Sequence, residues 1–241
     1  LSQLSSAIDY ALSESHNGHF IIEDFLEKEG NSSDCDSFTV DGELVFCSFN
    51  DQHFDSQALN PYTPAAFSWP STMPQWAQEE LMSELQRLMS LLKVKTGVYN
   101  IETRLCKNGK PYIMELAPRG GGNRLSEMMK YISGQDLIDN CVRAAVGDSI
   151  DEIHQPEYDG YWAEIILHSE RDGVFQSIEI DKTVEERFLI EKDIWVKTGD
   201  KVQGFTGANT TIGTLVLRFN TNEEMTCCLS NQETWFKIIV L

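Results

Sequence analysis

The chain has 241 residues, of which 41% are hydrophobic and 24% charged, and its formal net charge is −19. This length suffices for one large domain or two small ones, each with a buried core. The negative charge argues against a nucleic acid or an anionic membrane as partner. No apolar run approaches the ~20 residues that a membrane-spanning helix needs, and no signal-peptide pattern opens the sequence.

The six cysteines show no C-x-x-C spacing, and several lie in apolar segments. This pattern disfavours both a zinc site and a disulfide framework. We expect buried, reduced thiols, as in a cytoplasmic protein. The five histidines are scattered and show no ligand spacing. The sequence begins without Met inside a helical pattern, and we therefore expect it to be part of a longer protein.

Three elements are predicted in the N-terminal part. Residues 3–14 carry apolar side chains at helical spacing and predict a helix. The apolar run HFIIEDFL, residues 19–26, predicts a buried strand. Residues 36–49 predict a hairpin that turns at Asp41 and Gly42.

The middle of the chain combines an irregular segment with three helices. Residues 50–75 contain four of the seven prolines and predict an extended, irregular crossing. Residues 75–94 predict an amphipathic helix. Its apolar stripe is expected at Leu81, Leu85, Leu88 and Leu92. Two shorter helices are predicted at 124–132 and 136–147, and each is expected to end at a glycine: Gly134 and Gly147.

From about Tyr158 the pattern changes to short apolar runs separated by turn residues. Such a pattern is typical of strands joined by tight connections. Five strands are predicted, at 161–168, 173–180, 193–202, 212–219 and 235–241. We interpret this part as a small strand-rich subdomain.

The segment IETRLCKNGKPYIMELAPRGGGN, residues 101–123, predicts a second hairpin. Asn108 and Gly109 are the strongest short signal for a two-residue type I′ turn. Pairing across such a turn places Glu102 directly opposite Glu115. The other face then carries apolar pairs: Leu105 with Tyr112, Thr103 with Met114, and Ile101 with Leu116.

Two glutamates side by side need an explanation, because like charges on opposed strand positions are destabilising. The side chains could splay into water, or share a proton that raises one pKa. They could also hold a divalent cation such as Mg²⁺. Residues 93–143 carry nine Lys or Arg and five Asp or Glu, a net charge of +4, so the remaining residues carry −23. A locally basic segment in an acidic chain favours the third explanation, with a cation that bridges to an anionic ligand.

The segment APRGGGN follows the second glutamate. A glycine-rich turn can bring backbone N–H groups close to an anion, and Arg119 offers a planar fork of donors suited to phosphate or carboxylate. Three glycines alone are equally typical of a flexible loop. Asn123 could complete a metal shell or cap the following helix.

These residues together resemble the ATP-grasp superfamily of ATP-dependent carboxylate–amine ligases. The resemblance is carried by the acidic hairpin ending in APRGGGN and by FIIEDFLEKEG before TVDGELV. APRGGGN is similar to the L-amino-acid ligase and carbamoyl-phosphate-synthase-like branch rather than to biotin carboxylases. The resemblance covers about residues 1–150, and the strand-rich tail is similar to the small closing subdomain of some of these ligases.

The resemblance implies an α+β, ATP-grasp fold of antiparallel sheets with packed helices, here lacking its N-terminal part. Residues 1–50 would form part of the nucleotide-binding lobe, and residues 51–157 the core lobe with the metal and phosphate site. Residues 158–241 would form the C-terminal subdomain. The implied function is an ATP- and Mg²⁺-dependent (or Mn²⁺-dependent) ligase that activates a carboxylate as an acyl-phosphate for attack by an amine.

The implied partners are small-molecule carboxylates and amines, amino acids among them, and an oligomer is compatible with the sequence. The alternative is a non-catalytic, degenerate ATP-grasp-like domain. A plain cation-binding β module is a further rival, but it leaves Arg119 and the glycines unexplained.

Site residues are carried over by position. Glu102 and Glu115 match the acidic metal ligands, and Arg119 matches the arginine that stabilises the transferring phosphoryl group. Asn123 is a candidate third metal ligand. The candidate nucleotide-binding residues are Glu23, Asp24, Leu26, Arg104, Gly121 and Gly122. Arg104 could equally form a surface salt bridge.

Three departures from the family pattern stand out. Ala117 occupies the position where many members carry an Asn metal ligand, so Asn123 or water must substitute. EKEGNSSDCD looks longer than the usual connection and offers no clear acid for the ribose. Nothing in residues 1–20 matches the lysine and glycine-rich flap that cover the ATP phosphates, and we expect the isolated chain to fold without catalysing.

Overall fold

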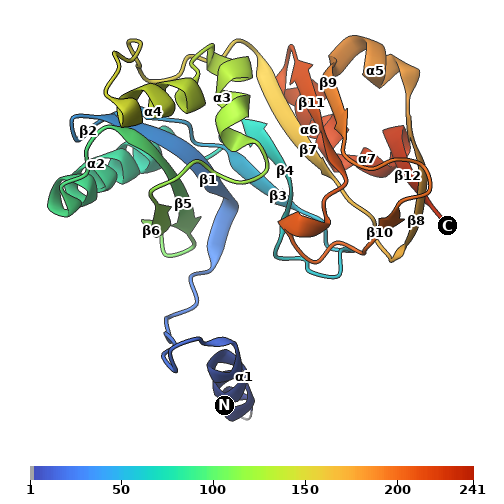
Figure 1. The fold of residues 1–241 in the computed structure, drawn as a ribbon, viewed down its shortest axis with the longest axis horizontal. Helices are drawn as coiled ribbons and strands as arrows, with labels where there is room; N and C mark the ends of the chain where they lie inside the picture. Colours follow the sequence, from blue (N-terminus) through green and yellow to red (C-terminus); the bar gives the residue numbers. More distant parts are fainter. Residues whose placement is uncertain (1–2) are drawn as a thin grey trace.

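The structure is a computed structural model that describes residues 3–241. It has the α+β architecture with antiparallel sheets that the sequence predicts (Figure 1). Three sheets are present in the described residues, with strand orders β2-β1-β5-β6, β3-β4-β7-β11-β9 and β10-β8-β12. The three-part domain division stays a prediction.

The four-stranded sheet carries the candidate site. It consists of β1 (Lys28–Val40), β2 (Glu43–Cys47), β5 (Gly97–Cys106) and β6 (Pro111–Ala117). Asp41 and Gly42 join β1 to β2 with positive φ angles of 51° and 88°. Both central residues of a type I′ turn need positive φ, so the predicted first hairpin is confirmed.

Helix α2 (Gln75–Leu92) packs on one face of this sheet. Its buried stripe repeats every four residues: Ala77, Leu81, Leu85 and Met89. The helix is confirmed, but two residues of the predicted stripe are not part of it. Leu88 is only partly buried and Leu92 is 57% exposed, because an i, i+4 row drifts around the helix away from them.

The five-stranded sheet contains two strands from the proline-rich segment 50–75, where no strand was predicted. β3 (Asp51–Phe54) and β4 (Pro64–Trp69) pair with each other, and β4 pairs with β7 (Tyr161–Leu167). The predicted irregular crossing is therefore wrong. One proline begins β4 and the others lie outside both strands, and these are positions where proline costs a sheet no hydrogen bond.

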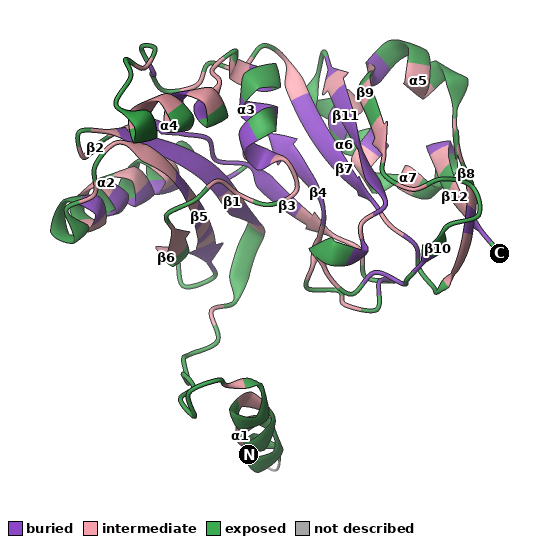
Figure 2. Cartoon of the chain, in the orientation of Figure 1, coloured by how far each residue is buried: buried purple, intermediate pink, exposed green. Residues whose placement is uncertain are grey.

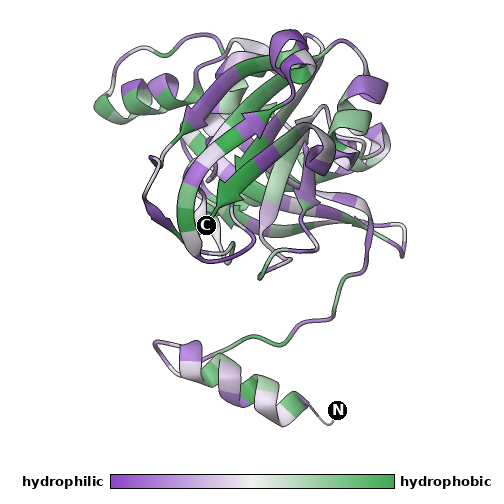
Figure 3. Cartoon of the chain, turned by 90° about the vertical axis from the view of Figure 1, so that its right-hand side faces the viewer, coloured by the Kyte–Doolittle hydropathy of each residue, from purple (hydrophilic) through white to green (hydrophobic). Residues whose placement is uncertain are grey.

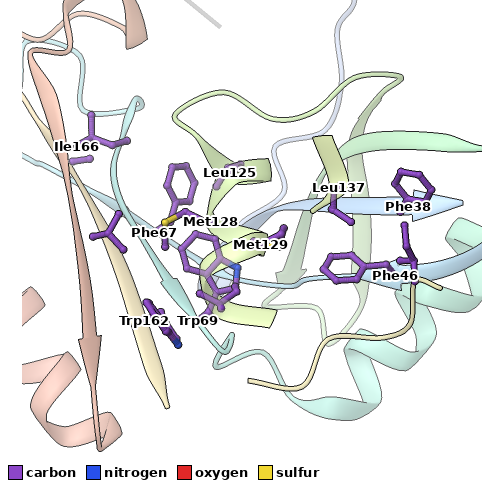
Figure 4. Close-up of a cluster of buried hydrophobic side chains, with 14 of the residues drawn as sticks. Phe38, Phe46, Phe67, Trp69, Leu125, Met128, Met129, Leu137, Trp162 and Ile166 are labelled. Carbon is purple, nitrogen blue, oxygen red and sulfur yellow. The ribbon is translucent and has the colours of Figure 1, made fainter. Parts of the chain in front are cut away.

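Helices α3 (Leu125–Ser133) and α4 (Leu137–Val146) confirm the two short predicted helices. Glycines with left-handed φ angles, 74° and 83°, follow their last residues: Gly134 and Gly147. The apolar face of α3 lies between the two larger sheets (Figure 4). Leu125, Met128 and Met129 contact one continuous core there, so α3 is held firmly against both sheets.

The C-terminal part contains more helix than the sequence predicts. The strands β8 (Gly173–Ile180), β11 (Gly213–Phe219) and β12 (Phe236–Val240) match their predicted positions closely. The predicted strand 193–202 is instead the end of β9 (Leu189–Ile194), a loop, and β10 (Lys201–Val202). Short helical elements fill the connections: α5 (Lys182–Phe188), η1 (Ala208–Thr210), α6 (Asn222–Ser230) and α7 (Gln232–Trp235).

Helix α1 (Leu4–Glu14) confirms the first predicted helix but lies apart from the body (Figures 1 and 2). The view turned by 90° shows the same separation (Figure 3). The predicted buried strand at 19–26 is wrong, because this segment is irregular and Ile21 and Phe25 are 82% and 86% exposed. An apolar run forms a buried strand only when a sheet edge pairs with it, and none does so in the described residues.

All six cysteines are free, and four of them are buried. Cys141 is partly buried and Cys227 exposed, so the expected burial holds for four of the six thiols. None of the helices in residues 3–241 is both long and apolar enough to cross a membrane.

Candidate active site

The glutamate hairpin forms with the predicted pairing at its centre. Glu102 on β5 faces Glu115 on β6, and Ile101 faces Leu116. Nearer the turn, however, the register differs from the prediction by one residue, so that Thr103 faces Ile113. A β-bulge at Met114 separates the two registers.

The turn itself explains the need for a bulge. Gly109 alone has positive φ, 74°, and its N–H donates to the Cys106 carbonyl over 2.8 Å. The Cys106 N–H donates to the Lys110 carbonyl over 3.0 Å, so the loop has three residues instead of the predicted two. The bulge compensates for this extra residue and keeps the glutamates opposite each other.

The bulge also changes which β6 side chain enters the core. Ile113 packs against the α2 cluster, whereas Met114 is 39% exposed. Tyr112 faces Arg104 on the opposite face of the sheet. The predicted apolar pairs of Tyr112 and Met114 are therefore wrong.

Two aspartates of β1 extend the acidic row. Asp34 faces Glu102 from the other side, so that three carboxylates lie on neighbouring strands: Asp34, Glu102 and Glu115. Two positions along β1, Asp36 faces Asn100. The Asn100 Nδ2 donates to an oxygen of Asp34 over 2.6 Å and of Asp36 over 3.2 Å.

Burial and mutual repulsion make these carboxylates reluctant to ionise. Burial raises the pKa of Asp34 to about 6, the Asn100 amide opposes the shift, and Asp36 and Glu102 add to it. Burial also raises the pKa of Glu102, which Arg104 opposes and Glu115 reinforces. Negative charge is therefore in excess here, and a bound cation would relieve it.

The loop after β6 brings Arg119 and the glycines to the same place. The Gly121 N–H donates to Asp36 Oδ1 over 2.8 Å. A Cβ on Gly121 would lie 2.7 Å from Asn100 Nδ2, whereas one on Gly122 would meet nothing within 4 Å. Gly121 is thus packed against the sheet, while Gly122 is open to an approaching ligand.

Arg119 is exposed, and its Nη1 donates over 2.8 Å to the carbonyl of its neighbour Gly120. Its charge opposes the raised pKa values of Asp34 and Asp36, whose main cause is burial. The guanidinium therefore lies beside the acidic row, with donors available to an anion.

Asn123 and Arg124 lead into α3 with left-handed φ angles of 50° and 63°. The side chain of Asn123 makes no hydrogen bond among the described residues. The N-cap position of α3 is occupied by Arg124, so Asn123 does not cap this helix. The Arg124 guanidinium is committed elsewhere, at 2.6 Å from Glu191 and 2.8 Å from Glu127. It joins α3 to β9, away from the glutamate pair.

The predicted nucleotide-binding residues of the N-terminal segment are only partly brought to the site. Glu23 and Asp24 are exposed on the irregular segment before β1. Leu26 is connected to the hairpin, because the Arg104 Nη1 donates to its carbonyl over 3.0 Å. The Arg104 Nε also donates to Ser32 Oγ over 3.1 Å, so this side chain fastens the segment to the sheet.

The donor set fits a divalent cation that is shared with a phosphate. Within residues 3–241, no three His, Cys, Asp or Glu side chains converge as a complete metal cage. Mg²⁺ is commonly held by one or two carboxylates plus substrate phosphates, and Glu102 and Glu115 supply that number. Hard oxygen donors with excess negative charge are what such an ion requires.

Sequence reasoning missed four residues of this site: Asp34, Asp36, Asn100 and Ser126. The Ser126 hydroxyl donates to Asp36 Oδ2 from the first turn of α3. The available signal was the D-x-D spacing in EGNSSDCD, since strand side chains two apart share a face. The expected connection EKEGNSSDCD is instead mostly the first part of β1, which begins at Lys28.

Comparison with known proteins supports the same fold. A family model described as an ATP-grasp domain matches residues 2–127. Carnosine synthase 1 of Gallus gallus is 28% identical over 118 residues, which are 49% of this chain and 12% of that protein. The crystal structure of phosphoribosylglycinamide synthetase from Anaerococcus prevotii aligns with a TM-score of 0.76 at 16% identity, covering 100% of this chain and 60% of that chain.

The crystal structure of L-amino acid ligase from Bacillus licheniformis aligns with a TM-score of 0.74, also at 16% identity. The alignment covers 90% of this chain and 53% of that one, so this chain spans about half the length of that ligase. The family match extends over just over half of the chain and includes both glutamates and the glycine loop. The chain therefore belongs to the ATP-grasp family.

Proposed function

We propose that this chain is the ATP-binding part of a ligase that joins a small carboxylate to an amine. ATP phosphorylates the carboxylate, the amine attacks the acyl-phosphate, and an amide, ADP and phosphate result. The reaction of the ATP-grasp ligases supports this proposal, together with the acidic pair and the adjoining arginine. ATP and Mg²⁺ are the cofactors of such ligases, and amino acids are the substrates we propose.

Glu102 and Glu115 would hold the divalent cation, with Asn123 as a further candidate ligand. The cation, when bound, supplies charge neutralisation between the ATP phosphates. The two carboxylates face each other across adjacent strands, one of them half-buried. Strand pairing fixes the backbone positions of both residues, so their carboxylates can converge on one cation.

Arg119 would stabilise the negative charge that spreads over the transferring phosphoryl group. Its guanidinium is exposed and makes its one side-chain hydrogen bond to its own loop. It therefore needs little desolvation or rearrangement to meet an anion. The open Gly122 backbone lies in the same loop, where an N–H group can contact a phosphate oxygen.

The adenine would lie towards the segment before β1, where we propose contacts from Leu26, Glu23 and Asp24. Arg104 would act from the sheet side, near the ribose or a phosphate. It already links Leu26 to Ser32, and this supports a role in holding the segment against the sheet.

The observation that carries the proposal is the direct pairing of Glu102 and Glu115 beside Arg119. The test is Mg²⁺-dependent ADP release by the full-length protein, with a panel of amino acids as carboxylate and amine. Glu115→Gln should reduce the rate at least about a hundredfold, since phosphoryl transfer depends on charge neutralisation. Glu152→Gln, an exposed residue of a loop, serves as control.

Wild-type activity that Glu115→Gln leaves unchanged would show that the glutamate pair is only a solvated surface. No ADP release with any carboxylate and amine would favour the non-catalytic alternative. Each result is interpretable only if circular dichroism shows that the variants are folded like the wild type.

A further inference from the structure

Asp36 is a buried carboxylate whose partners lie mostly on the glycine loop and α3. It is 1% exposed and sits on β1, more than eighty residues before that loop. One oxygen accepts from the Gly121 N–H over 2.8 Å and from Asn100 Nδ2 over 3.2 Å. The other accepts from the Ser126 hydroxyl at the start of α3.

Within residues 3–241, the backbone of the loop makes no other hydrogen bond to β1. For residues 118–124, the remaining backbone hydrogen bonds in the described structure are local, such as the Arg119 N–H to the Ala117 carbonyl over 2.8 Å. The Gly121 N–H to Asp36 is the one backbone bond from this loop to β1. The ion pairs of Arg124 hold the C-terminal end of the loop, so the contact with Asp36 is what ties its middle to β1.

The glycines of the loop fit this contact closely. A Cβ on Gly121 would lie 2.9 Å from Asp36 Oδ1, and one on Gly120 would lie 2.5 Å from Ser126 Oγ. Both distances are shorter than real Cβ contacts, so two of the three glycines are explained by the approach of the loop to Asp36. Gly122 is not, which leaves it for a ligand.

Burying an ionised aspartate costs free energy unless hydrogen bonds or a nearby positive charge stabilise the carboxylate. Burial raises the pKa of Asp36, and the bonds from Ser126, Gly121 and Asn100 oppose that shift. Arg119 lies close enough to oppose it as well. Two of the three donors to Asp36 therefore belong to the segment that carries Arg119: Gly121 in the middle of the loop and Ser126 just after it.

We infer that Asp36 is a positioning residue, which fixes the loop of residues 118–124 so that Arg119 is held beside the glutamate pair. The inference extends the proposed function, since it assigns to β1 the control of a group that would contact the phosphates. Asp36 itself touches neither substrate nor cation in this account.

The first test measures amide hydrogen exchange in this chain. Asp36→Ala should speed exchange at Gly121 and its neighbours at least about tenfold, because a bond to a charged group is lost. Asp36→Asn keeps an acceptor oxygen and should give a smaller increase. Ser48→Ala is the matched control: it removes a 3.2 Å bond from a buried hydroxyl to the Asp36 carbonyl and leaves the loop contacts intact.

Unchanged exchange at Gly121 in Asp36→Ala would overturn the inference, and so would an equal increase in the loop and in strand β7. If Asp36→Ala does not fold, Asp36→Asn and Ser126→Ala carry the same comparison.

The second test is a double-mutant cycle on ADP release by the full-length protein. Asp36→Asn should lower kcat with little change in the KM for ATP. In an Arg119→Ala background, Asp36→Asn should lower kcat by a further factor of less than about two, because the group that Asp36 positions is already absent. Independent, multiplicative losses would contradict positioning. If the wild type releases no ADP, the proposed function fails, while the exchange experiment still decides whether Asp36 anchors the loop.

Discussion

At the scale of single residues, Glu164 is a fully buried carboxyl group without a hydrogen-bond partner in residues 3–241. It lies on the central strand β7 with 0% exposure. Burial raises its pKa well above the ordinary value of 4.5, and the charge of Arg124 opposes the shift. Such a group is expected to hold its proton in the folded state.

The folded state therefore binds one more proton than the unfolded chain over a range of pH that begins near 4.5. Stability falls as pH rises through this range. Glu164→Gln removes the titration, so its free energy of unfolding should exceed that of the wild type at neutral and alkaline pH. Below the ordinary pKa of glutamate the two proteins should have similar stability.

Urea unfolding of both proteins at several pH values checks this prediction. The exposed Glu152→Gln serves as the control for removal of a charge alone. A stability difference between wild type and Glu164→Gln that stays constant with pH would contradict a buried, protonated carboxyl group.

At the scale of elements, the glutamate hairpin has two irregularities that cancel. The three-residue loop at Gly109 shifts the register by one residue, and the bulge at Met114 shifts it back. In a type I′ turn both Asn108 and Gly109 would have positive φ, so replacing either by alanine would strain the backbone. In the observed loop, only Gly109 has positive φ.

Gly109→Ala should therefore lower the free energy of unfolding by about 1–2 kcal/mol, the cost of a left-handed residue with a Cβ. Asn108→Ala should cost less than about 1 kcal/mol, since it loses only exposed hydrogen bonds to the Lys110 N–H and Tyr112 hydroxyl. Chemical denaturation of the two variants measures the difference. Equal losses in both would favour the two-residue turn.

Strongly patterned elements could be predicted from the sequence, and so could the central pairing of the site. The helix α2 and the hairpin at Asp41 follow from local periodicity and turn chemistry. The facing pair of Glu102 and Glu115 is predicted correctly although the predicted two-residue turn is wrong, because the bulge at Met114 restores the register. The bulge at Met114 could not be predicted, because it compensates for a loop that is one residue longer than the turn signal indicates. The same holds for α5, which fills a connection between strands.

Long-range contacts account for the missed part of the site. Asp36 gains its role from Gly121 and Ser126, which lie far from it in sequence. The D-x-D spacing places two acids on one face of a strand, but it does not say what covers them. The opposite error at 19–26 has the same origin, since its apolar side chains find no partner in residues 3–241.

At the scale of the whole molecule, the negative net charge opposes the binding of an anionic nucleotide at the candidate site. The net charge of −19 repels a nucleotide at long range, whereas the hairpin and its glycine loop lie in the locally basic segment. A divalent cation shared by protein and phosphate reconciles the two, because it adds positive charge where the acidic row would otherwise repel the ligand. The inactivity of this chain by itself stays a prediction.

The most direct test of this account is Mn²⁺ binding to the full-length protein, followed by electron paramagnetic resonance with and without ATP. Mn²⁺ should bind weakly alone and much more tightly with ATP. Glu102→Gln and Glu115→Gln should each weaken the ATP-dependent binding at least about tenfold, and Glu152→Gln should not. Unchanged ATP-dependent Mn²⁺ binding in both site variants would contradict a cation held between the paired glutamates.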